Sequence, residues 1–456
     1  MVRDLAVFLH GRRVGTISQG NGLTFHYSTD YLASDSPTPL SLSMPLGDKP
    51  LRNRITRAWI AGLLPADRTV RLRIAERGGV NPRNPVDLLS VVGLDCPGAV
   101  QTCWADRTGE VDERNAALRT VDEEWIGQRI ARFSRDEASW QIADERWSIG
   151  GGQSKFTLTR TATGWADPVG SAPSTHIIKP GVSGVRHQAL NEHLCLGILH
   201  RAGIRTASSQ YLDFDGKWAI VERRFDRLGL GEQTTRLHSE DLCQALGNLY
   251  PYERDGGPHA KDICTLLLSA AGVQSRDRFV DALIGSYLIG SPDGHARNYS
   301  VLLSGSDVAL APLYDVASSL PYDVSDEGIM HQRTVAMSIG RQRQFGMIRE
   351  TEWRRFFESV SLDPDRGLGR VRQLAQALPE AAVAVFAEAQ DLPGTPQLAA
   401  RMLPSIQRLC QGVTETPGRR PQPVPLSGRS SSGGRVWIPP HDRGGRPVRG
   451  HWRKLT

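Results

Sequence analysis

The order of short elements between residues 147 and 226 most constrains how this chain can fold. A glycine cluster, SIGGGQSK, precedes two strand-like stretches, FTLTR and THII, and the second leads directly to Lys179. A helical pattern then runs from about Gln188 to Ala202, where Gly203 is a stop signal. The stretches QYLDF and KWAIVE flank Asp215-Gly216, which predicts a β-hairpin. The sequence therefore predicts one lobe, built in the order glycine turn, strands, lysine, helix and hairpin.

Beyond Asp226 the pattern becomes mostly helical. The helical stretches are SEDLCQALG, AKDICTLLLSAAG, DRFVDALIGSYLIG, ETEWRRFFESV and an Ala-rich region near 370–410. One strand pair interrupts them, YSVLL (299–303) and VAL (308–310), joined by the turn residues SGSD. We therefore expect a helical lobe over residues 227–412.

Residues 1–105 have the pattern of a separate, small β-rich subdomain. The strand-like stretches LAVFLH, RVGTIS and LTFHY precede a helical candidate around TRAWIAGLL. The charged, Trp-containing segment that follows predicts a solvated helical connection over residues 106–146. Together these patterns predict an α+β chain with a mostly helical C-terminal lobe.

The net charge of +6 is concentrated at the end of the chain. Residues 413–456 hold nine Lys/Arg and two Asp/Glu, which leaves 46 basic and 47 acidic residues at positions 1–412. Of the 44 residues at positions 413–456, 18 are Gly, Pro or Ser, so we expect a disordered basic tail over 413–456. The rest of the chain is nearly neutral and lacks the basic footprint of a DNA-binding protein.

The sequence also indicates a cellular setting. The first residues, MVRDLAVFLHGRR, lack the hydrophobic region of a signal peptide, and no apolar run approaches the roughly 20 residues of a membrane span. The six cysteines show neither CxxC nor Cys/His ligand spacing, so neither a disulfide framework nor a zinc site is indicated. We expect a cytoplasmic protein with no membrane partner.

The loop SPDGHARN, residues 291–298, carries the strongest chemical signal. Phosphoryl transfer from ATP needs a carboxylate at the acceptor hydroxyl, an amide and a second carboxylate on magnesium, a lysine and backbone N–H groups on the phosphates. Asp293 and Asn298 have the D-x-x-x-x-N spacing of a kinase catalytic loop, and the following hairpin returns the chain to Asp315. With Lys179 and the triple glycine, the order of these residues favours a magnesium-dependent kinase.

Each of these residues also has an ordinary structural explanation. An Asp-Gly pair after a helix is usually a turn, and a lysine at a strand end usually reaches solvent. Glu192, on the helix after Lys179, is either that lysine's partner or an exposed helix residue. His295 is expected to orient Asp293 or a phosphate rather than to bind metal, because no second His or Cys stands near it in sequence.

Six stretches in order resemble the HipA family of serine/threonine kinase toxins: SIGGGQSKF, THIIKP, NEHLCLGIL, VERRFDR, DGHARNYSVLL and LAPLYDVASS. GLTFHYSTDYL, PLSLSMPL, GLLPADRTVRLRIAERGGV and DLLSVVGLDCPGAV resemble that family's N-terminal subdomain, so the similarity covers roughly residues 1–405. The resemblance implies a two-lobed protein-kinase-like fold, with the N-lobe over 147–226 and the C-lobe over 227–412. It also implies a type II toxin–antitoxin system with a HipB-like antitoxin, through which any DNA contact would be indirect. The substrate would be a translation component such as an aminoacyl-tRNA synthetase, and its phosphorylation would cause growth arrest and persistence.

The same resemblance implies roles for individual residues. Asp293 would be the catalytic aspartate, acting with Lys179 and His295, while Asn298 and Asp315 would be the magnesium ligands.

Nucleotide binding would fall to the glycine loop and to a hinge for the adenine. Ser148 would be the loop serine that such kinases can autophosphorylate. The ATP-binding residues would be Gly150, Gly151, Gly152, Gln153, Lys155, Lys179, Glu222, Arg223, Arg224 and Phe225.

The chain departs from the family pattern before the catalytic aspartate, where Ser291-Pro292 replaces the usual Asn-Thr. Proline fixes its own backbone and restricts the residue before it, so the loop position and the activity can differ. A small-molecule phosphotransferase also uses D-x-x-x-x-N but normally has His two residues before the Asp, where this chain has Ser291. A weakly active co-repressor within an antitoxin–DNA complex is a further alternative.

Overall fold

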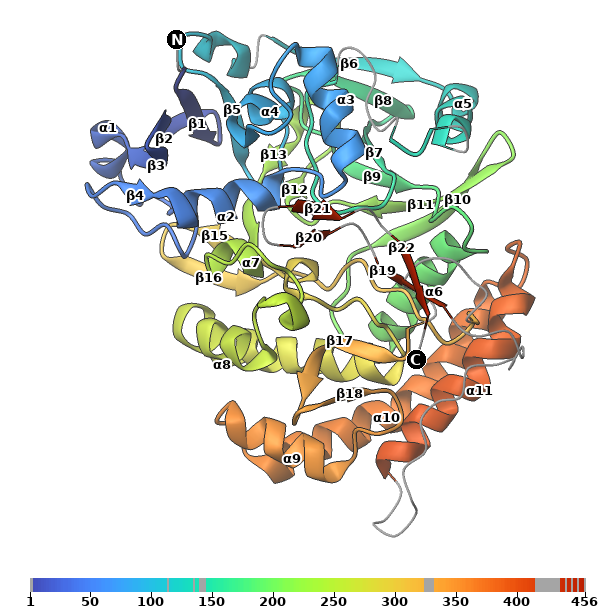
Figure 1. Ribbon diagram of the computed structural model, residues 1–456. Helices are drawn as coiled ribbons and strands as arrows, with labels where there is room; N and C mark the ends of the chain where they lie inside the picture. The colour runs from blue at the N-terminus through green and yellow to red at the C-terminus, as the bar shows by residue number, and fades with distance from the viewer. Residues whose placement is uncertain are drawn as a thin grey trace. The chain divides into compact units, whose positions relative to one another are not determined.

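The computed structural model describes residues 3–112, 115–133, 136–138, 145–323 and 332–414, together with four short strands between 435 and 454. The chain, shown in Figure 1, divides into two compact units. The first unit comprises Met1–Gly181, Ile204–Ala282 and His295–Asp315, and the second comprises Val182–Gly203, Leu283–Gly294 and Val316–Thr456.

The first unit begins with a five-stranded antiparallel sheet in the order β4-β3-β2-β1-β5. Strand β1, which lies between β2 and β5, is buried along its whole length. The expected N-terminal strands are confirmed. The bounds are β1 Leu5–Leu9, β2 Arg12–Gly20, β3 Gly22–Tyr27, β4 Leu51–Arg52 and β5 Val100–Trp104.

Helices α1 (Thr29–Leu32), α2 (Asn53–Leu63), α3 (Arg68–Gly78) and α4 (Pro85–Val92) belong to the same part of the chain. Helix α2 was expected, whereas α3 and α4 were not. Their ends nevertheless carry standard signals. Asp67 accepts hydrogen bonds from the first-turn amides of α3, and Gly79 ends that helix with a left-handed φ of 60°. Asn84 caps α4, and Pro85 occupies its first turn.

A six-stranded antiparallel sheet follows in the order β10-β11-β9-β7-β8-β6. The hairpin at Asp215-Gly216 joins β10 to β11, as predicted. The bounds are β6 Ala116–Val121, β7 Phe156–Arg160, β8 Trp165–Gly170, β9 His176–Lys179, β10 Ser209–Phe214 and β11 Lys217–Arg223.

The segment 106–146 is more than the helical connection that its charge pattern predicted. It contains a 3₁₀-helix (Thr108–Val111) and α5 (Glu123–Phe133), but also β6, which pairs with β8 along six residues. Strand β8 was not predicted. Its Pro168 lies opposite Leu118 of β6 and beyond residues 165–166, which pair with β7, so the proline removes no ladder bond to β7.

One hydrophobic core runs through the five-stranded and the six-stranded sheet of the first unit. Its members include Leu5, Trp59 and Leu89 from the N-terminal part and Phe156 and Val221 from the six-stranded sheet. The N-terminal subdomain is therefore packed as part of the same unit rather than as a separate module.

A third sheet, β14-β15-β16, consists of His238–Asp241, Ser300–Ser304 and Asp307–Leu310. The hairpin β15–β16 is confirmed, but SEDLCQALG was wrongly predicted to be helical throughout. Its start pairs with β15, and only α7 (Leu242–Ala245) is helical. The first unit also contains two short strands, β12 (Arg227–Leu228) and β13 (Thr235–Arg236). Further 3₁₀-helices of this unit are Gly231–Gln233, Glu253–Asp255 and Ala296–Asn298.

Helix α8 (Ala260–Leu288) corresponds to the two helical stretches expected there. Gly272 separates them with a non-helical φ of 76° and ψ of 177°.

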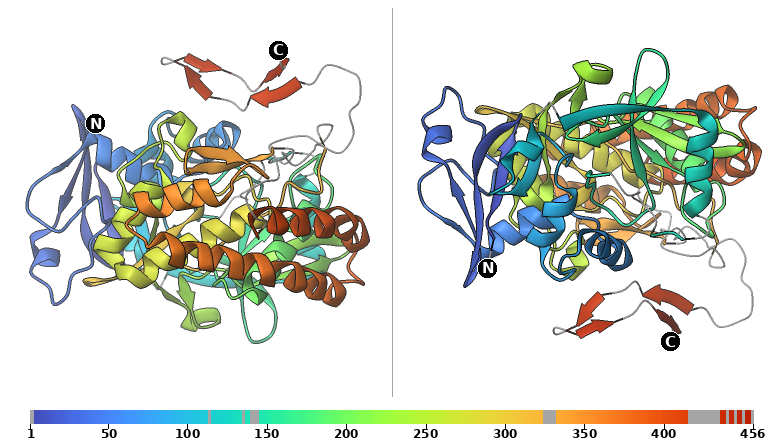
Figure 2. Two further views of the ribbon diagram at one scale, coloured as in Figure 1. Left: turned by 90° about the horizontal axis from the view of Figure 1, so that it is seen from below. Right: turned by 90° about the horizontal axis from the view of Figure 1, so that it is seen from above.

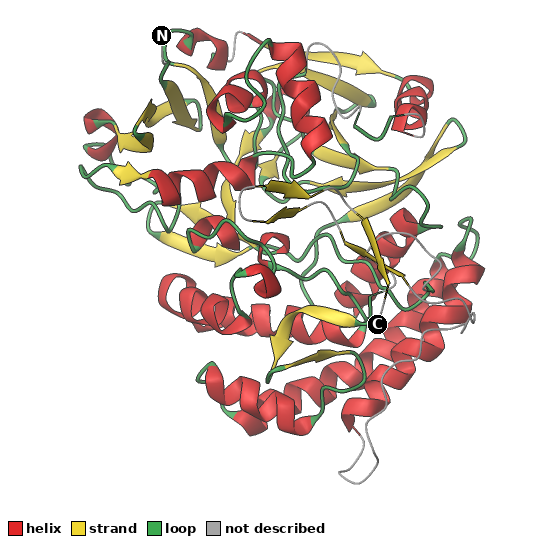
Figure 3. Ribbon diagram, viewed as in Figure 1, coloured by secondary structure: helices red, strands yellow, loops and turns green. Residues whose placement is uncertain are grey.

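The second unit is mostly helical (Figure 3). Helix α6 (Gln188–Arg201) was predicted to within one residue. The Ala-rich region forms α10 (Pro364–Glu388) and α11 (Thr395–Thr414), which lie side by side in Figure 2, and α9 (Glu350–Ser359) packs against α10. A short pair, β17 (Thr334–Ile339) and β18 (Gln342–Gln344), was not predicted.

The tail contains the four remaining strands: β19 (Arg435–Ile438), β20 (His441–Arg443), β21 (Arg446–Val448) and β22 (His451–Lys454). Strand β19 pairs with β22, and β20 with β21. The rest of the predicted disordered tail lies outside the described residues.

Two further expectations concern the described residues. All six cysteines are unbridged and buried. Across the part of the chain that the structure describes, no helix has the length and apolar character required to cross a membrane.

A buried carboxyl group, Glu240 on β14, predicts a pH-dependent stability. Its Oε1 accepts a hydrogen bond from the Leu42 amide at 2.7 Å. Burial raises its pKa to about 8, and the neighbouring Asp241 adds to this, while hydrogen bonds from Ser41 and Leu42 oppose it. The folded protein therefore keeps a proton that the unfolded chain loses at its ordinary pKa of 4.5. This stabilisation is complete below that pH and is lost as the pH rises through about 8.

In Glu240→Gln this pH dependence should be absent, since the amide is neutral throughout. We expect its thermal midpoint to exceed that of the wild type by several degrees at pH 9 and by less at pH 5. Scanning calorimetry at pH 5, 7 and 9 measures this, with the exposed Glu76→Gln as control. A constant difference across these pH values would contradict the prediction.

Candidate functional site

Lys179 ends β9 and has a buried side chain that contacts two carboxylates. Its Nζ lies 3.1 Å from Glu222 Oε2 and 3.1 Å from Asp315 Oδ1. Lys179 pairs with Ile220 on β11, so Glu222, two residues further along, lies diagonally on the same face. Strand register thus brings together a lysine and a glutamate from two separate predicted motifs.

Asp315 is held in an unusual backbone conformation. Its φ is 58°, the left-handed region, which costs most residues roughly 1–2 kcal/mol. The segment before it is fixed by neighbouring chain, since the Leu313 amide donates to Arg205 O at 2.9 Å and the Ala207 amide to Leu313 O at 2.7 Å. A residue that its surroundings hold in a sparsely populated backbone region is a common feature of functional sites.

The charge of Asp315 is also fixed. Burial raises the pKa of Asp315, but the opposing effect of Lys179, Lys155 and His295 is larger. The pKa therefore falls from its ordinary value of 3.8 to about 2. Its side chain remains 36% exposed, so an ionised carboxylate is accessible at neutral pH.

The residues after Gly294 form a short, well-anchored turn in the first unit. The Asn298 amide donates to His295 O at 2.9 Å, and the Ala296 amide to Pro251 O at 3.2 Å. The His295 ring meets the edge of Tyr252 with 4.5 Å between centroids. Its buried Nδ1 has no hydrogen-bond partner among the described residues, so this nitrogen can still bind a ligand.

Asp293 itself belongs to the second unit, five residues before Asn298 in the chain. It is half-buried. The preceding Ser291 is buried, and its amide donates to Ser286 O at 2.8 Å, which anchors the start of the loop to the end of α8.

Glu192, also in the second unit, is fully buried on α6 and accepts a hydrogen bond from Gln188 at 3.4 Å. The alternative of an exposed helix glutamate is therefore wrong. Its pairing with Lys179 stays a prediction.

The glycine loop is attached to the N-terminal subdomain. The Ser148 hydroxyl is buried and donates to Leu63 O at 2.5 Å, while its amide donates to Asp95 O at 3.0 Å. The Ala66 amide donates to Gly151 O at 2.9 Å. At Gly150 an added Cβ would lie 2.9 Å from Gly62 O, so this close approach requires glycine.

The other predicted loop residues lie beside these contacts. Lys155 is buried, and its Nζ donates to Gly150 O at 2.8 Å. Gly152 is exposed, with open space where a side chain would be, and Gln153 is half-buried.

The predicted hinge, Glu222–Phe225, is held on both sides. The Arg223 amide donates to Ser208 O and the Arg224 amide to Thr175 O, both at 2.9 Å. Phe225 stacks on Tyr314 with 5.4 Å between centroids, and the Tyr314 hydroxyl donates to Arg297 O at 2.7 Å. Because the Arg224 guanidinium is buried in ion pairs, any part of Arg224 in nucleotide binding would involve its backbone, and this stays a prediction.

Sequence reasoning missed three contributors to this arrangement: Asp95, Tyr252 and Tyr314. Asp95 and Tyr314 lie inside quoted motifs, GLDCPGAV and LAPLYDVASS, but no local spacing reveals their partners.

Among the described residues, no group of three or more His, Cys, Asp and Glu side chains is arranged to hold a metal ion.

Comparison with known proteins places this chain in a family. The model of the HipA-like C-terminal domain matches residues 147–382, and that of the HipA N-terminal domain matches residues 5–103. The first alone covers more than half of the chain.

Two relatives extend over most of this chain. The protein named "Putative kinase Y4mE" of Sinorhizobium fredii is 29% identical over 86% of this chain and 94% of its own length. The "Serine/threonine-protein kinase toxin HipA" of Shewanella oneidensis is 27% identical over 79% of this chain and 83% of its own length.

A solved structure confirms the predicted fold. A chain in the Shewanella oneidensis MR-1 complex of HipA, HipB and operator DNA superposes with a TM-score of 0.76. The match covers 90% of this chain and 97% of that chain, at 22% identity. The predicted α+β, two-lobed kinase-like architecture is therefore correct, and the chain belongs to the HipA family.

Proposed function

We propose that this protein is a magnesium-dependent serine/threonine-protein kinase that uses ATP, and a toxin of the HipA type. The observation that carries the proposal is the contact of Lys179 with Glu222 and Asp315, with Asp315 ionised and held at a left-handed φ. A nucleoside triphosphate and its metal require a lysine, an accessible carboxylate and a glycine loop. The first unit contains all three.

The residues present suit magnesium. Mg²⁺ is usually held by one or two carboxylates together with substrate phosphates, rather than by a cage of protein ligands. Asp315 supplies an ionised oxygen and Asn298 an amide oxygen, so these two would be the ligands. Bound magnesium would neutralise charge that develops on the phosphates.

The remaining roles follow from the same assignment. Asp293 would accept the proton of the substrate hydroxyl, and His295 would orient that carboxylate or a phosphate oxygen. Lys179 and Lys155 would contact phosphates with the glycine loop, Gly150–Gln153. The adenine would lie against the hinge, Glu222–Phe225.

The partner and substrate are proposed from relatives. One is named a serine/threonine-protein kinase toxin, and the solved complex contains HipB and operator DNA. We infer a HipB-like antitoxin partner, DNA contact through that antitoxin, and a cytoplasmic substrate in translation such as an aminoacyl-tRNA synthetase. The nearly neutral charge of residues 1–412 agrees with indirect DNA contact.

Autophosphorylation at Ser148 would require a local rearrangement. The hydroxyl is buried and bonded to Leu63 O, so the loop must first leave the N-terminal subdomain. A phosphate at this position would add about two negative charges, which would prevent the loop from returning to its buried position.

Comparative phosphoproteomics tests the proposal. Cells expressing the wild type should stop growing and gain phosphate on a translation protein, whereas cells expressing Asp293→Asn should do neither. Purified wild type with ATP should phosphorylate that protein when Mg²⁺ is present and lose the activity in EDTA. The same spectra report whether Ser148 carries phosphate.

Two outcomes would contradict the proposal. Equal growth arrest and equal phosphorylation with both proteins would remove the kinase assignment. Transfer to an aminoglycoside or choline, with no protein substrate, would favour a small-molecule phosphotransferase.

A further inference from the structure

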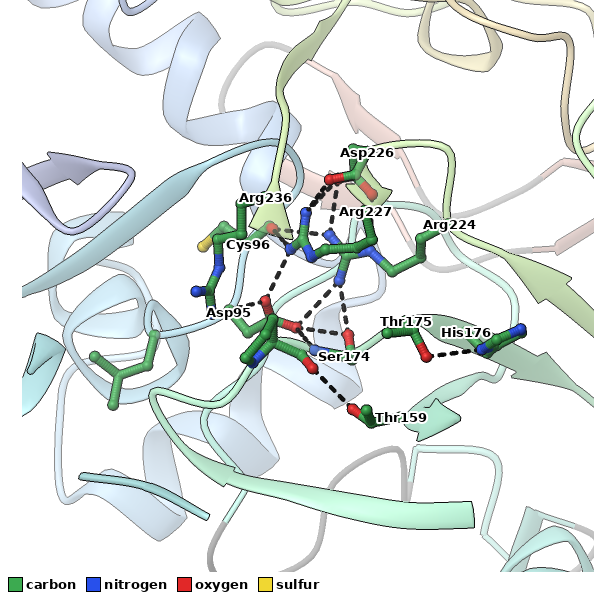
Figure 4. A network of polar contacts seen from close by, with 12 residues as sticks. Asp95, Cys96, Thr159, Ser174, Thr175, His176, Arg224, Asp226, Arg227 and Arg236 are labelled. Atoms are coloured by element: carbon green, nitrogen blue, oxygen red, sulfur yellow. Dashed lines mark hydrogen bonds and ion pairs between the residues drawn. The ribbon is translucent and has the colours of Figure 1, made fainter. Parts of the chain in front are cut away.

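A cluster of buried charges joins the N-terminal subdomain to the end of the hinge. Figure 4 shows this Asp95 cluster, in which two carboxylates meet three guanidinium groups. The five side chains are between 1% and 12% exposed. Its members are Asp95, Arg224, Asp226, Arg227 and Arg236.

Asp95 has the most partners in the cluster. Its Oδ1 lies 2.8 Å from Arg227 and 3.3 Å from Arg236, and its Oδ2 lies 3.1 Å from Arg224. The Ser174 hydroxyl also donates to Oδ2, at 2.6 Å. Burial alone would raise the pKa of Asp95, but the three guanidiniums hold it below its ordinary range.

The backbone beside Asp95 is bound by the same arginines. Cys96 O accepts hydrogen bonds from Arg224 and Arg227, both at 2.9 Å, and Gly98 O accepts from Arg227 at 2.8 Å. Asp226 in turn accepts from the Gly98 amide at 2.6 Å. Segment 95–98 is therefore held firmly against residues 224–227.

Both predicted nucleotide-binding segments adjoin this cluster. On one side, Asp95 forms a parallel bridge with Trp147, and its carbonyl accepts the Ser148 amide at the start of the glycine loop. On the other side, Arg224 belongs to the hinge itself, where it follows Glu222 by two residues and directly precedes Phe225. Glu222 in turn contacts Lys179.

Such a cluster is not explained by stability alone. Burying five charged groups carries a large desolvation penalty, and well-packed apolar residues often stabilise a core equally well. Directed ion pairs instead fix the relative position of the segments that carry them.

We propose that Asp95 is a positioning residue for nucleotide binding, which holds the glycine loop and the hinge at a fixed separation. The inference rests on the proposed kinase function. It assigns the N-terminal subdomain a direct part in shaping the ATP site, although Asp95 itself contacts no nucleotide.

The test compares Asp95→Asn with Asp167→Asn in the full-length protein. Asp167 is also fully buried and paired with an arginine, Arg119, but on β8 and outside the cluster. Asp95→Asn should lose stability, because three buried guanidinium groups lose their charged partner. At a temperature well below all thermal midpoints, only Asp95→Asn should raise the Mg·ATP Kd and the KM for ATP, by about tenfold or more, with a smaller change in kcat. Amide exchange at Ser148 should also become faster only in Asp95→Asn.

A milder variant keeps the test decisive if Asp95→Asn does not fold. Ser174→Ala removes one hydrogen bond to Asp95 and should raise the KM and the Ser148 exchange rate to a smaller extent.

If Asp95→Asn folds and has wild-type values of the KM for ATP and of Ser148 exchange, the inference is overturned and the kinase proposal stays intact. If Asp95→Asn does not fold, wild-type values in Ser174→Ala have the same consequence. A wild-type protein that binds no nucleotide would overturn the proposed function, and this inference with it.

Discussion

Replacing Asp293 by asparagine is expected to slow phosphoryl transfer by about 10²- to 10⁴-fold while the protein stays folded and binds nucleotide. Asparagine has the same shape as aspartate but cannot accept the proton of the substrate hydroxyl. Asp293 is half-buried, and the loop before it is anchored through the Ser291 amide, so the substitution leaves these backbone contacts in place.

Single-turnover phosphorylation with isotopically labelled ATP measures this loss, and calorimetry measures nucleotide affinity. Asp307→Asn, an exposed carboxylate at the start of β16, is the matched control and should have wild-type activity. Unchanged turnover in Asp293→Asn would show that this carboxylate is not the base, even if ATP is bound.

Asp315→Asn should lower turnover by about 10²-fold or more and weaken the response to magnesium. Asparagine tolerates the left-handed φ of 58° as aspartate does, so the variant removes the charge without adding backbone strain. Lys179 keeps its contact with Glu222, which preserves its position. The loss should therefore come from metal and phosphate binding rather than from misfolding.

A magnesium titration at saturating ATP separates these causes. In Asp315→Asn, the concentration of Mg²⁺ for half-maximal activity should rise clearly, with a thermal midpoint within a few degrees of the wild type. Asp307→Asn again serves as the control. Identical magnesium curves for the variant and the wild type would contradict the ligand assignment of Asp315.

Local signals explain what sequence reasoning predicted correctly. The Asp215-Gly216 turn and the stop at Gly203 depend on a few adjacent residues, and the structure has both. Binary patterning likewise predicted the strands β1, β2 and β3.

Tertiary pairing explains the errors. Strand β6 was hidden in a charged segment because its stability comes from pairing with β8, nearly 50 residues away. Ser239–Asp241 was taken for helix because its hydrogen bonds go to β15, about 60 residues along the chain. Neither partner is visible in a local window of sequence.

The sequence by itself determined the chemistry available to this protein: an ordered lysine, aspartate, asparagine and aspartate, a glycine loop, and family motifs over most of the chain. Only the tertiary structure decided that Glu222 meets Lys179 and that Asp95 meets Arg224, residues 43 and 129 positions apart. Such contacts depend on strand register and on the shared core of two sheets. Their free energy arises when distant segments pack together, so no short stretch of sequence encodes them.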